Sequence, residues 1–108
     1  MNRIVTILAT AILTARLGRI DFQGHQETWY DLNMSKVVSN AHDHGIDGEY
    51  WINDDGLKML GNYVMCAGHP SRYGELVETS RGIGIIVDTG DFAKERPNDI
   101  DVATAWGK

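Results

Sequence analysis

Two aspartates, Asp88 and Asp101, are the residues of this chain whose positions most favour chemistry. Asp88 follows the apolar run from Gly82 to Val87 and directly precedes the turn pair Thr89-Gly90, while Asp101 lies inside a second apolar segment, Ile100 to Ala103. Functional side chains are often held at the ends of rigid strands, so both acids are expected at one rim. Carboxyl groups crowded into an apolar wall resist ionisation, which raises at least one pKa. The pair therefore predicts a general acid that is protonated at neutral pH.

Each acid also has a structural explanation. An aspartate before Thr-Gly commonly forms a turn by accepting backbone N–H bonds, which would account for Asp88. An exposed edge strand would account for Asp101 between two apolar neighbours. The stretch Asp54-Asp55-Gly56 is typical of a turn.

Other reactive residues have weaker patterns. Cys66 lies in the apolar run YVMCA and is expected to be a small buried hydrophobe, and as the single cysteine it can form no internal disulfide. His42-Asp43-His44 could supply metal ligands, but it also fits a polar helix end, and no second ligand motif accompanies it. We therefore expect no metal site and no cofactor.

The elements that must position the acids are mostly short strands. One helix is expected over Lys36 to His44, started by Ser35 or Asn33 and stopped by Gly45. The preceding residues, Leu17 to Leu32, are polar and mixed and are interpreted as a connector. Strands are predicted at Tyr50 to Ile52, Tyr63 to Ala67, Leu76 to Thr79, Gly84 to Val87 and Ile100 to Ala103. Short strands separated by frequent turns favour a small barrel.

The runs YWINDDGLKMLGNYVMCA, GIGIIVDTGDFA and DIDVATAW together resemble the 3D domain, a family of bacterial and phage cell-wall proteins named for three aspartates. The resemblance covers about residues 27 to 107. It implies a mainly β, small α+β fold: a six-stranded double-psi β-barrel with one or two short helices, related to membrane-bound lytic transglycosylase A and rare lipoprotein A. The DTG segment alone also occurs in aspartic proteases, which need two such lobes or a homodimer.

Carried over by motif, Asp88 matches the aspartate of the family's DTG segment and Asp101 the aspartate of its last barrel strand. The third family aspartate is missing, because His69 is the residue nearest its place, and Asp91 stands where many relatives have glycine. The resemblance makes Asp101 and Asp88 catalytic candidates. It makes His69, Asp91, Thr89 and Gly90 candidates for substrate binding.

The activity that the resemblance implies is that of a lytic transglycosylase, which cleaves the β-1,4 bond between N-acetylmuramic acid (MurNAc) and N-acetylglucosamine (GlcNAc) in peptidoglycan. One carboxyl can protonate the leaving oxygen and then accept a proton from the sugar's 6-hydroxyl, which closes a 1,6-anhydro ring. The implied partner is a peptidoglycan glycan strand. The missing third aspartate leaves open a non-catalytic module that binds glycan or protein on the same barrel.

The amino-acid composition limits the number of domains and the kinds of partner that are expected. A chain of 108 residues with 43% hydrophobic side chains suits one compact domain. Its formal net charge of -5 repels phosphate backbones, so nucleic acid is not an expected partner.

The first residues raise a question of export. Ile4 to Ala15 is an apolar run after Arg3, too short to span a bilayer and similar to the core of a secretory signal. If residues 1–15 act as a signal, the protein is secreted or held in the cell envelope; otherwise it is phage-borne or cytoplasmic. If the segment Ile4 to Leu13 is retained and exposed, self-association through it is expected. The chain is accordingly divided into an apolar segment with a connector, 1–26, and a barrel domain, 27–108.

Overall fold

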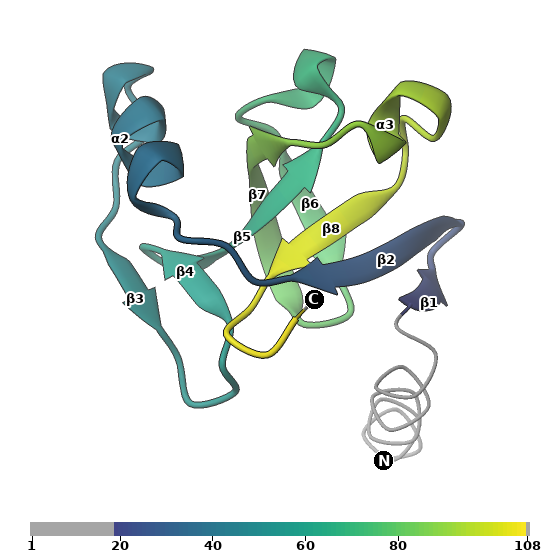
Figure 1. Ribbon diagram of the computed structural model, residues 1–108, viewed down its shortest axis with the longest axis horizontal. Coiled ribbons are helices and arrows are strands. Elements are labelled where there is room, and N and C mark those ends of the chain that lie inside the picture. Colours follow the sequence, from purple (N-terminus) through teal and green to yellow (C-terminus); the bar gives the residue numbers. More distant parts are fainter. Residues whose placement is uncertain (1–18, 108) are drawn as a thin grey trace.

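The computed structural model describes residues 19–107 as a curled, mixed β-sheet with two short helices (Figure 1). The predictions for Ile4 to Ala15 lie outside the described residues. The strands are β1 (Arg19–Phe22), β2 (His25–Tyr30), β3 (Tyr50–Ile52), β4 (Lys58–Leu60), β5 (Tyr63–Gly68), β6 (Leu76–Thr79), β7 (Gly82–Thr89) and β8 (Ile100–Ala103). The helices are α2 (Ser35–Asp43) and α3 (Phe92–Glu95), with a single 3-10 turn η1 (Pro70–Arg72).

Strand β5 is the central strand of the sheet and pairs with three other strands. Six strands form the continuous path β1-β2-β8-β5-β4-β3, and β7 joins at β5 and carries β6. Along one edge β5 pairs in parallel with β7. Its other edge is shared, because the first half pairs with β4 and the second half with β8, both antiparallel. A second parallel pair joins β2 to β8. The two strands that carry the predicted acids, β7 and β8, lie on either side of β5.

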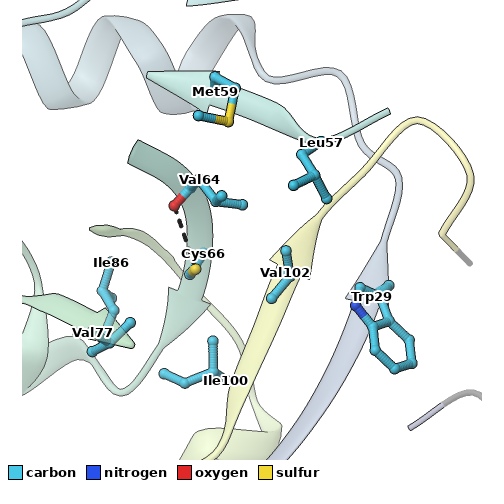
Figure 2. Packing of buried hydrophobic residues seen from close by; sticks show 9 residues of the cluster. All are labelled: Trp29, Leu57, Met59, Val64, Cys66, Val77, Ile86, Ile100 and Val102. Carbon is cyan, nitrogen blue, oxygen red and sulfur yellow. Dashed lines mark hydrogen bonds between the residues drawn. The ribbon is translucent and has the colours of Figure 1, made fainter. Parts of the chain in front are cut away.

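The sheet curls around one apolar cluster, which we call the sheet core (Figure 2). Six strands and the residue before β4 contribute to it: Trp29, Leu57, Met59, Val64, Cys66, Val77, Ile86, Ile100 and Val102. Since successive side chains of a strand point to opposite faces, residues from so many strands can meet only if the sheet bends around them. Burial of this apolar area is the main stabilising contribution of the sheet.

The opposite face of the sheet packs against α2 and forms a second cluster, which we call the helix-side core. It consists of Met34, Ala41, Leu60, Met65, Ile85, Val87 and Ala103. Val37 and Val38 of α2 pack onto it, four and three residues before Ala41, which is the spacing of one helix face. The helix begins after Asn33, whose side-chain oxygen accepts a hydrogen bond from the Ser35 amide at 3.0 Å, and ends before Gly45, which has a φ of 81°. The helix therefore covers the sheet where β5, β7 and β8 lie together.

Most of the predicted elements are confirmed. The strands Tyr50–Ile52, Leu76–Thr79 and Ile100–Ala103 have the predicted bounds, and the predicted helix over Lys36 to His44 is α2 shifted by one residue at each end. The mainly β, small α+β class is also confirmed. The sheet has eight strands, of which six form the curled path.

The connector expected before Leu32 was wrong. Residues 19–30 form the hairpin β1–β2, and β2 is an interior strand paired with β8. Strand β4 was also missed. The proposed division between residues 26 and 27 falls inside β2. Within residues 19–107, no helix has the length and apolarity needed to cross a bilayer.

Candidate functional site

The two predicted acids lie in one row of residues across four strands. Asp101 of β8 pairs with Thr28 of β2 on one side and with Ala67 of β5 on the other. Ala67 in turn pairs with Asp88 of β7. Residues paired side by side in a sheet point to the same face, so one small, buried side chain separates the two carboxylates. This row lies on the face that α2 covers.

An irregularity in β7 places Asp88 on that face. The pairing runs Cys66 with Ile86 and then Ala67 with Asp88, so Val87 is an extra residue opposite no partner of its own. With strict alternation Asp88 would share the face of Ile86, which lies in the sheet core. The bulge shifts the alternation by one residue, and both Val87 and Asp88 then lie toward α2. The sequence indicates a strand end here but not the inserted residue.

Each carboxylate accepts hydrogen bonds from strand β2 or from the turn. Asp101 Oδ1 accepts from Thr28 Oγ1 at 2.9 Å. Asp88 Oδ2 accepts from the Tyr30 hydroxyl at 2.8 Å, and Asp88 Oδ1 accepts from the Thr89 amide at 2.8 Å. Asp88 therefore does form the turn contact expected of an aspartate before Thr-Gly, and it also bonds to Tyr30. Both carboxylates are half-buried, and β8 is an interior strand, so the edge-strand explanation of Asp101 was wrong.

The surroundings favour a proton on Asp101. Burial raises the pKa of its carboxyl, the hydrogen bond from Thr28 lowers it, and the nearby Asp88 charge raises it again; the balance is a pKa above the ordinary value. Burial and the Asp88 carboxylate likewise raise the pKa of the Tyr30 phenol, so Tyr30 remains a hydrogen-bond donor. The pair thus combines a carboxyl shifted toward the neutral form with one held by two donors.

An open groove of about 440 Å³ lies beside the pair, between α2 and the end of β7. Its lining consists of Lys36, Val37, Asn40, Tyr73, Val87, Asp88 and Thr89. Asp101 is not part of this lining. Asp88 therefore connects the groove to the row that holds Asp101.

The other predicted site residues lie near the ends of β5 and β7. His69 follows β5, and its Nδ1 accepts from the Ser71 amide at 3.1 Å, so its ring caps the short η1 turn. Thr89 is exposed and lines the groove. Gly90 is tightly packed, because a Cβ there would come within 2.6 Å of the Phe92 ring. Asp91 is exposed and pairs with Lys94 at 3.4 Å, away from the groove lining.

The remaining candidates have structural roles. Cys66 is fully buried, as predicted, and burial raises the pKa of its thiol. His42 Nε2 lies 2.7 Å from the Gly48 carbonyl oxygen, and His44 Nδ1 lies 2.7 Å from the Asn40 carbonyl oxygen. Both rings therefore form hydrogen bonds with the backbone near the end of α2. In the described part of the chain, no three His, Cys, Asp or Glu side chains gather as a metal would require.

Sequence reasoning missed Thr28, Tyr30 and the buried Glu27, all in β2. Glu27 is 0% exposed and points to the face opposite the acids, where its carboxylate accepts from the Ser80 amide at 3.0 Å and from the Ser80 hydroxyl. The signal that could have identified β2 is the run Thr28-Trp29-Tyr30, because β-branched and aromatic residues are enriched in strands.

Comparisons with protein-family models, with curated proteins and with solved structures found no match to this chain.

Proposed function

We propose that the protein acts on peptidoglycan as a lytic transglycosylase-like enzyme, with Asp101 as the general acid. The observation that carries the proposal is the row in which Asp88 and Asp101 flank Ala67 on one face, with the pKa of Asp101 raised. Further support comes from the similarity of the VDTGDF and IDVA segments to the 3D domain. The site of action under this proposal is the cell envelope, whether reached by export or carried by a phage.

In the proposed reaction the protonated Asp101 carboxyl donates its proton to the oxygen that links MurNAc to GlcNAc. The bond from that oxygen to the MurNAc anomeric carbon breaks, and positive charge develops at that carbon. The Asp101 carboxylate then accepts the proton of the MurNAc 6-hydroxyl while the oxygen attacks the anomeric carbon. A 1,6-anhydro ring closes, the acid is regenerated, and no water is consumed.

Asp88 has a positioning and tuning role in this scheme. Its negative charge disfavours ionisation of Asp101, and the donors Tyr30 and Thr89 hold its own carboxylate in place. Thr28 orients the acid by donating a hydrogen bond to one oxygen of the Asp101 carboxyl. The other oxygen is then available to carry the proton that is transferred. Single-acid chemistry does not need the fixed carboxylate spacing of retaining and inverting hydrolases.

The finer fold assignment, a double-psi β-barrel, belongs to the same proposal. Two features of the sheet support it: the long-range parallel pairs β2–β8 and β5–β7, and the curl of the sheet around one core.

A second candidate is a non-catalytic glycan-binding module on the same scaffold. The observation that favours it is the place of His69, where the family has its third aspartate and where the ring is used to cap η1. In this case the groove binds a glycan strand without cleaving it.

The two functions are separated by incubating the protein with purified peptidoglycan and analysing the soluble products by mass spectrometry. The enzyme releases 1,6-anhydro muropeptides, Asp101→Asn abolishes the release, and Asp88→Asn reduces it. Asp54→Asn, in the exposed turn after β3, is the matched control and keeps full activity. Sedimentation with peptidoglycan but no anhydro product would overturn the enzyme in favour of the module.

A further inference from the structure

We propose that the open edge of β3 binds an extended segment of a partner protein in which basic residues lie on both sides of a short apolar stretch. The segment adds to the sheet as a further strand, a known mode of peptide recognition. None of the groove lining belongs to β3, so this surface is separate from the groove and from the acid pair. The inference therefore goes beyond the proposed function and does not depend on it.

The first argument is the lack of charge on the β3 edge (Figure 1). Of the strands that the structure describes, three leave one edge open: β1, β3 and β6. Open edges invite pairing with other chains, and proteins commonly protect them with charged side chains. Strand β1 has the exposed Arg19 and Asp21, and β6 has the exposed Glu78. The residues of β3 are instead all apolar and 40–48% exposed: Tyr50, Trp51 and Ile52.

The second argument is that the backbone of β3 has free hydrogen-bonding groups on its outer side. Just before β3, the Glu49 carbonyl oxygen accepts at 2.9 Å from an amide in the turn after β4. Just after β3, the Asn53 amide donates at 3.0 Å to the carbonyl oxygen of the residue before β4. Residues that bond to the partner strand alternate along an antiparallel ladder with residues that do not. Tyr50 and Ile52 therefore direct their N–H and C=O groups to the open edge.

The third argument is that the exposed side chains are held in place. Trp51 Nε1 donates to the Gly61 carbonyl oxygen at 2.8 Å, which fixes the indole on one face of the hairpin. On the other face Tyr50 pairs with Leu60, which in turn pairs with the exposed Tyr63, so the apolar surface continues inward from the edge. Rigid aromatic side chains are frequent anchors of protein interfaces, because little conformational entropy is lost when they bind.

The charge around the edge determines the kind of partner. Four exposed acids flank β3 and form no ion pair with a basic side chain among residues 19–107: Asp47, Glu49, Asp54 and Asp55. A second copy paired antiparallel about Trp51 would bring two such sets of acids together, and like charges on facing strands are destabilising. A segment with lysine or arginine on both sides of its apolar residues gains ion pairs at both ends. The occupant is therefore a basic segment of another protein.

The test is an NMR titration of the isotope-labelled full chain with three acetylated and amidated peptides. Their sequences are KKTVTVTKK, EETVTVTEE and KKGSGSGKK, so the second reverses the charge and the third removes the strand-forming residues. We expect the first peptide to shift the amide signals of Tyr50 and Ile52. It should bind about tenfold more tightly than the acidic peptide, as suits two or three exposed ion pairs, and more tightly than the glycine-serine peptide. The preference over the acidic peptide should fade as salt rises to about 0.5 M.

Variants locate the contact. Ile52→Pro removes one N–H of the open edge but none that bonds to β4, and it should lower the affinity for the first peptide about tenfold. Ile52→Thr keeps that N–H, is the matched control, and should retain most of the affinity. Glu49→Gln leaves the backbone intact and should lower the affinity about twofold, whereas Glu95→Gln, an exposed acid on α3, should leave it unchanged.

The outcomes that would overturn the inference are specific. They are equal binding of the basic and acidic peptides, no shift of the β3 signals, and full affinity in both Ile52→Pro and Glu49→Gln. Shifts of the same signals that depend on protein concentration alone would identify a second copy as the occupant and would also overturn it. Because no glycan takes part, none of these results bears on the cleavage assay.

Discussion

The hydrogen bond from Tyr30 to Asp88 links β2 to the acid pair, and its strength can be measured by a double-mutant cycle. Tyr30→Phe removes only the hydroxyl, which donates at 2.8 Å, and leaves the ring packed against the helix-side core. A hydrogen bond to a charged group contributes about 1.5–3 kcal/mol. Both partners are half-buried, so we expect the lower end, about 1.5 kcal/mol, as the coupling between Tyr30→Phe and Asp88→Ala.

The assay is urea denaturation of wild type, both single variants and the double variant at pH 7, read as free energies of unfolding. Tyr63→Phe is the matched control. It removes a hydroxyl from an exposed tyrosine at the start of β5 and should change stability by less than about 0.5 kcal/mol. A coupling energy below about 0.5 kcal/mol would show that the two groups do not interact as described, and the proposed link between Tyr30 and Asp88 would have to be abandoned.

Three further predictions concern stability. Because the pKa of Asp101 is raised in the folded state, its ionisation costs stability at pH 7; Asp101→Asn should therefore be more stable than wild type at pH 7 in urea denaturation, and the difference should shrink as the pH falls toward about 4. A difference independent of pH would contradict this origin. Ser80→Ala removes one donor to the buried Glu27 carboxylate and should lower the free energy of unfolding by about 2 kcal/mol, whereas an unchanged urea midpoint would argue against the buried link. Gly84→Ala places a Cβ 2.6 Å from Cys66 Sγ and should cost about 1–3 kcal/mol, with a smaller cost in a Cys66→Ala background; equal costs in both backgrounds would disprove the clash.

The parts of the fold that could be predicted are those whose own side-chain pattern matches the environment that they have in the fold. Strands such as Ile100–Ala103 consist mainly of apolar residues bounded by turns, and the helix α2 has a stop signal at Gly45. In these segments the pattern of side chains agrees with the final environment, so periodicity was sufficient.

Two of the strands that were missed, β2 and β4, carry charged residues into the interior. Glu27 in β2 is buried because Ser80, far along the chain, supplies its donors. Lys58 in β4 is 5% exposed because Asp31 and the Leu32 carbonyl oxygen accept from its Nζ at 2.5 Å. A local reading assigns such residues to the surface, because burial of a charge is favourable only with a partner that sequence distance conceals.

The candidate site, like the fold, could be predicted only in part. Asp88 and Asp101 were identified because each follows or interrupts an apolar strand, and such positions are rare for acids. Thr28 and Tyr30 were not, since they belong to the strand that was misread. The groove could not be foreseen either, because it forms between α2 and β7, whose contact depends on the tertiary fold.

The extra residue Val87 makes the site depend on length as well as on residue type. Deleting Val87 would place Asp88 directly after Ile86 and opposite Ala67, so simple alternation would keep the Asp88 carboxylate on the face of α2. The present chain paired with β5 without the bulge would instead turn that carboxylate into the apolar interior of the curl. An acid in a related chain therefore takes the place of Asp88 only if the number of residues in the strand and the presence of the bulge agree. In this fold the pairing of a single strand decides the position of the acid as much as the residue type does.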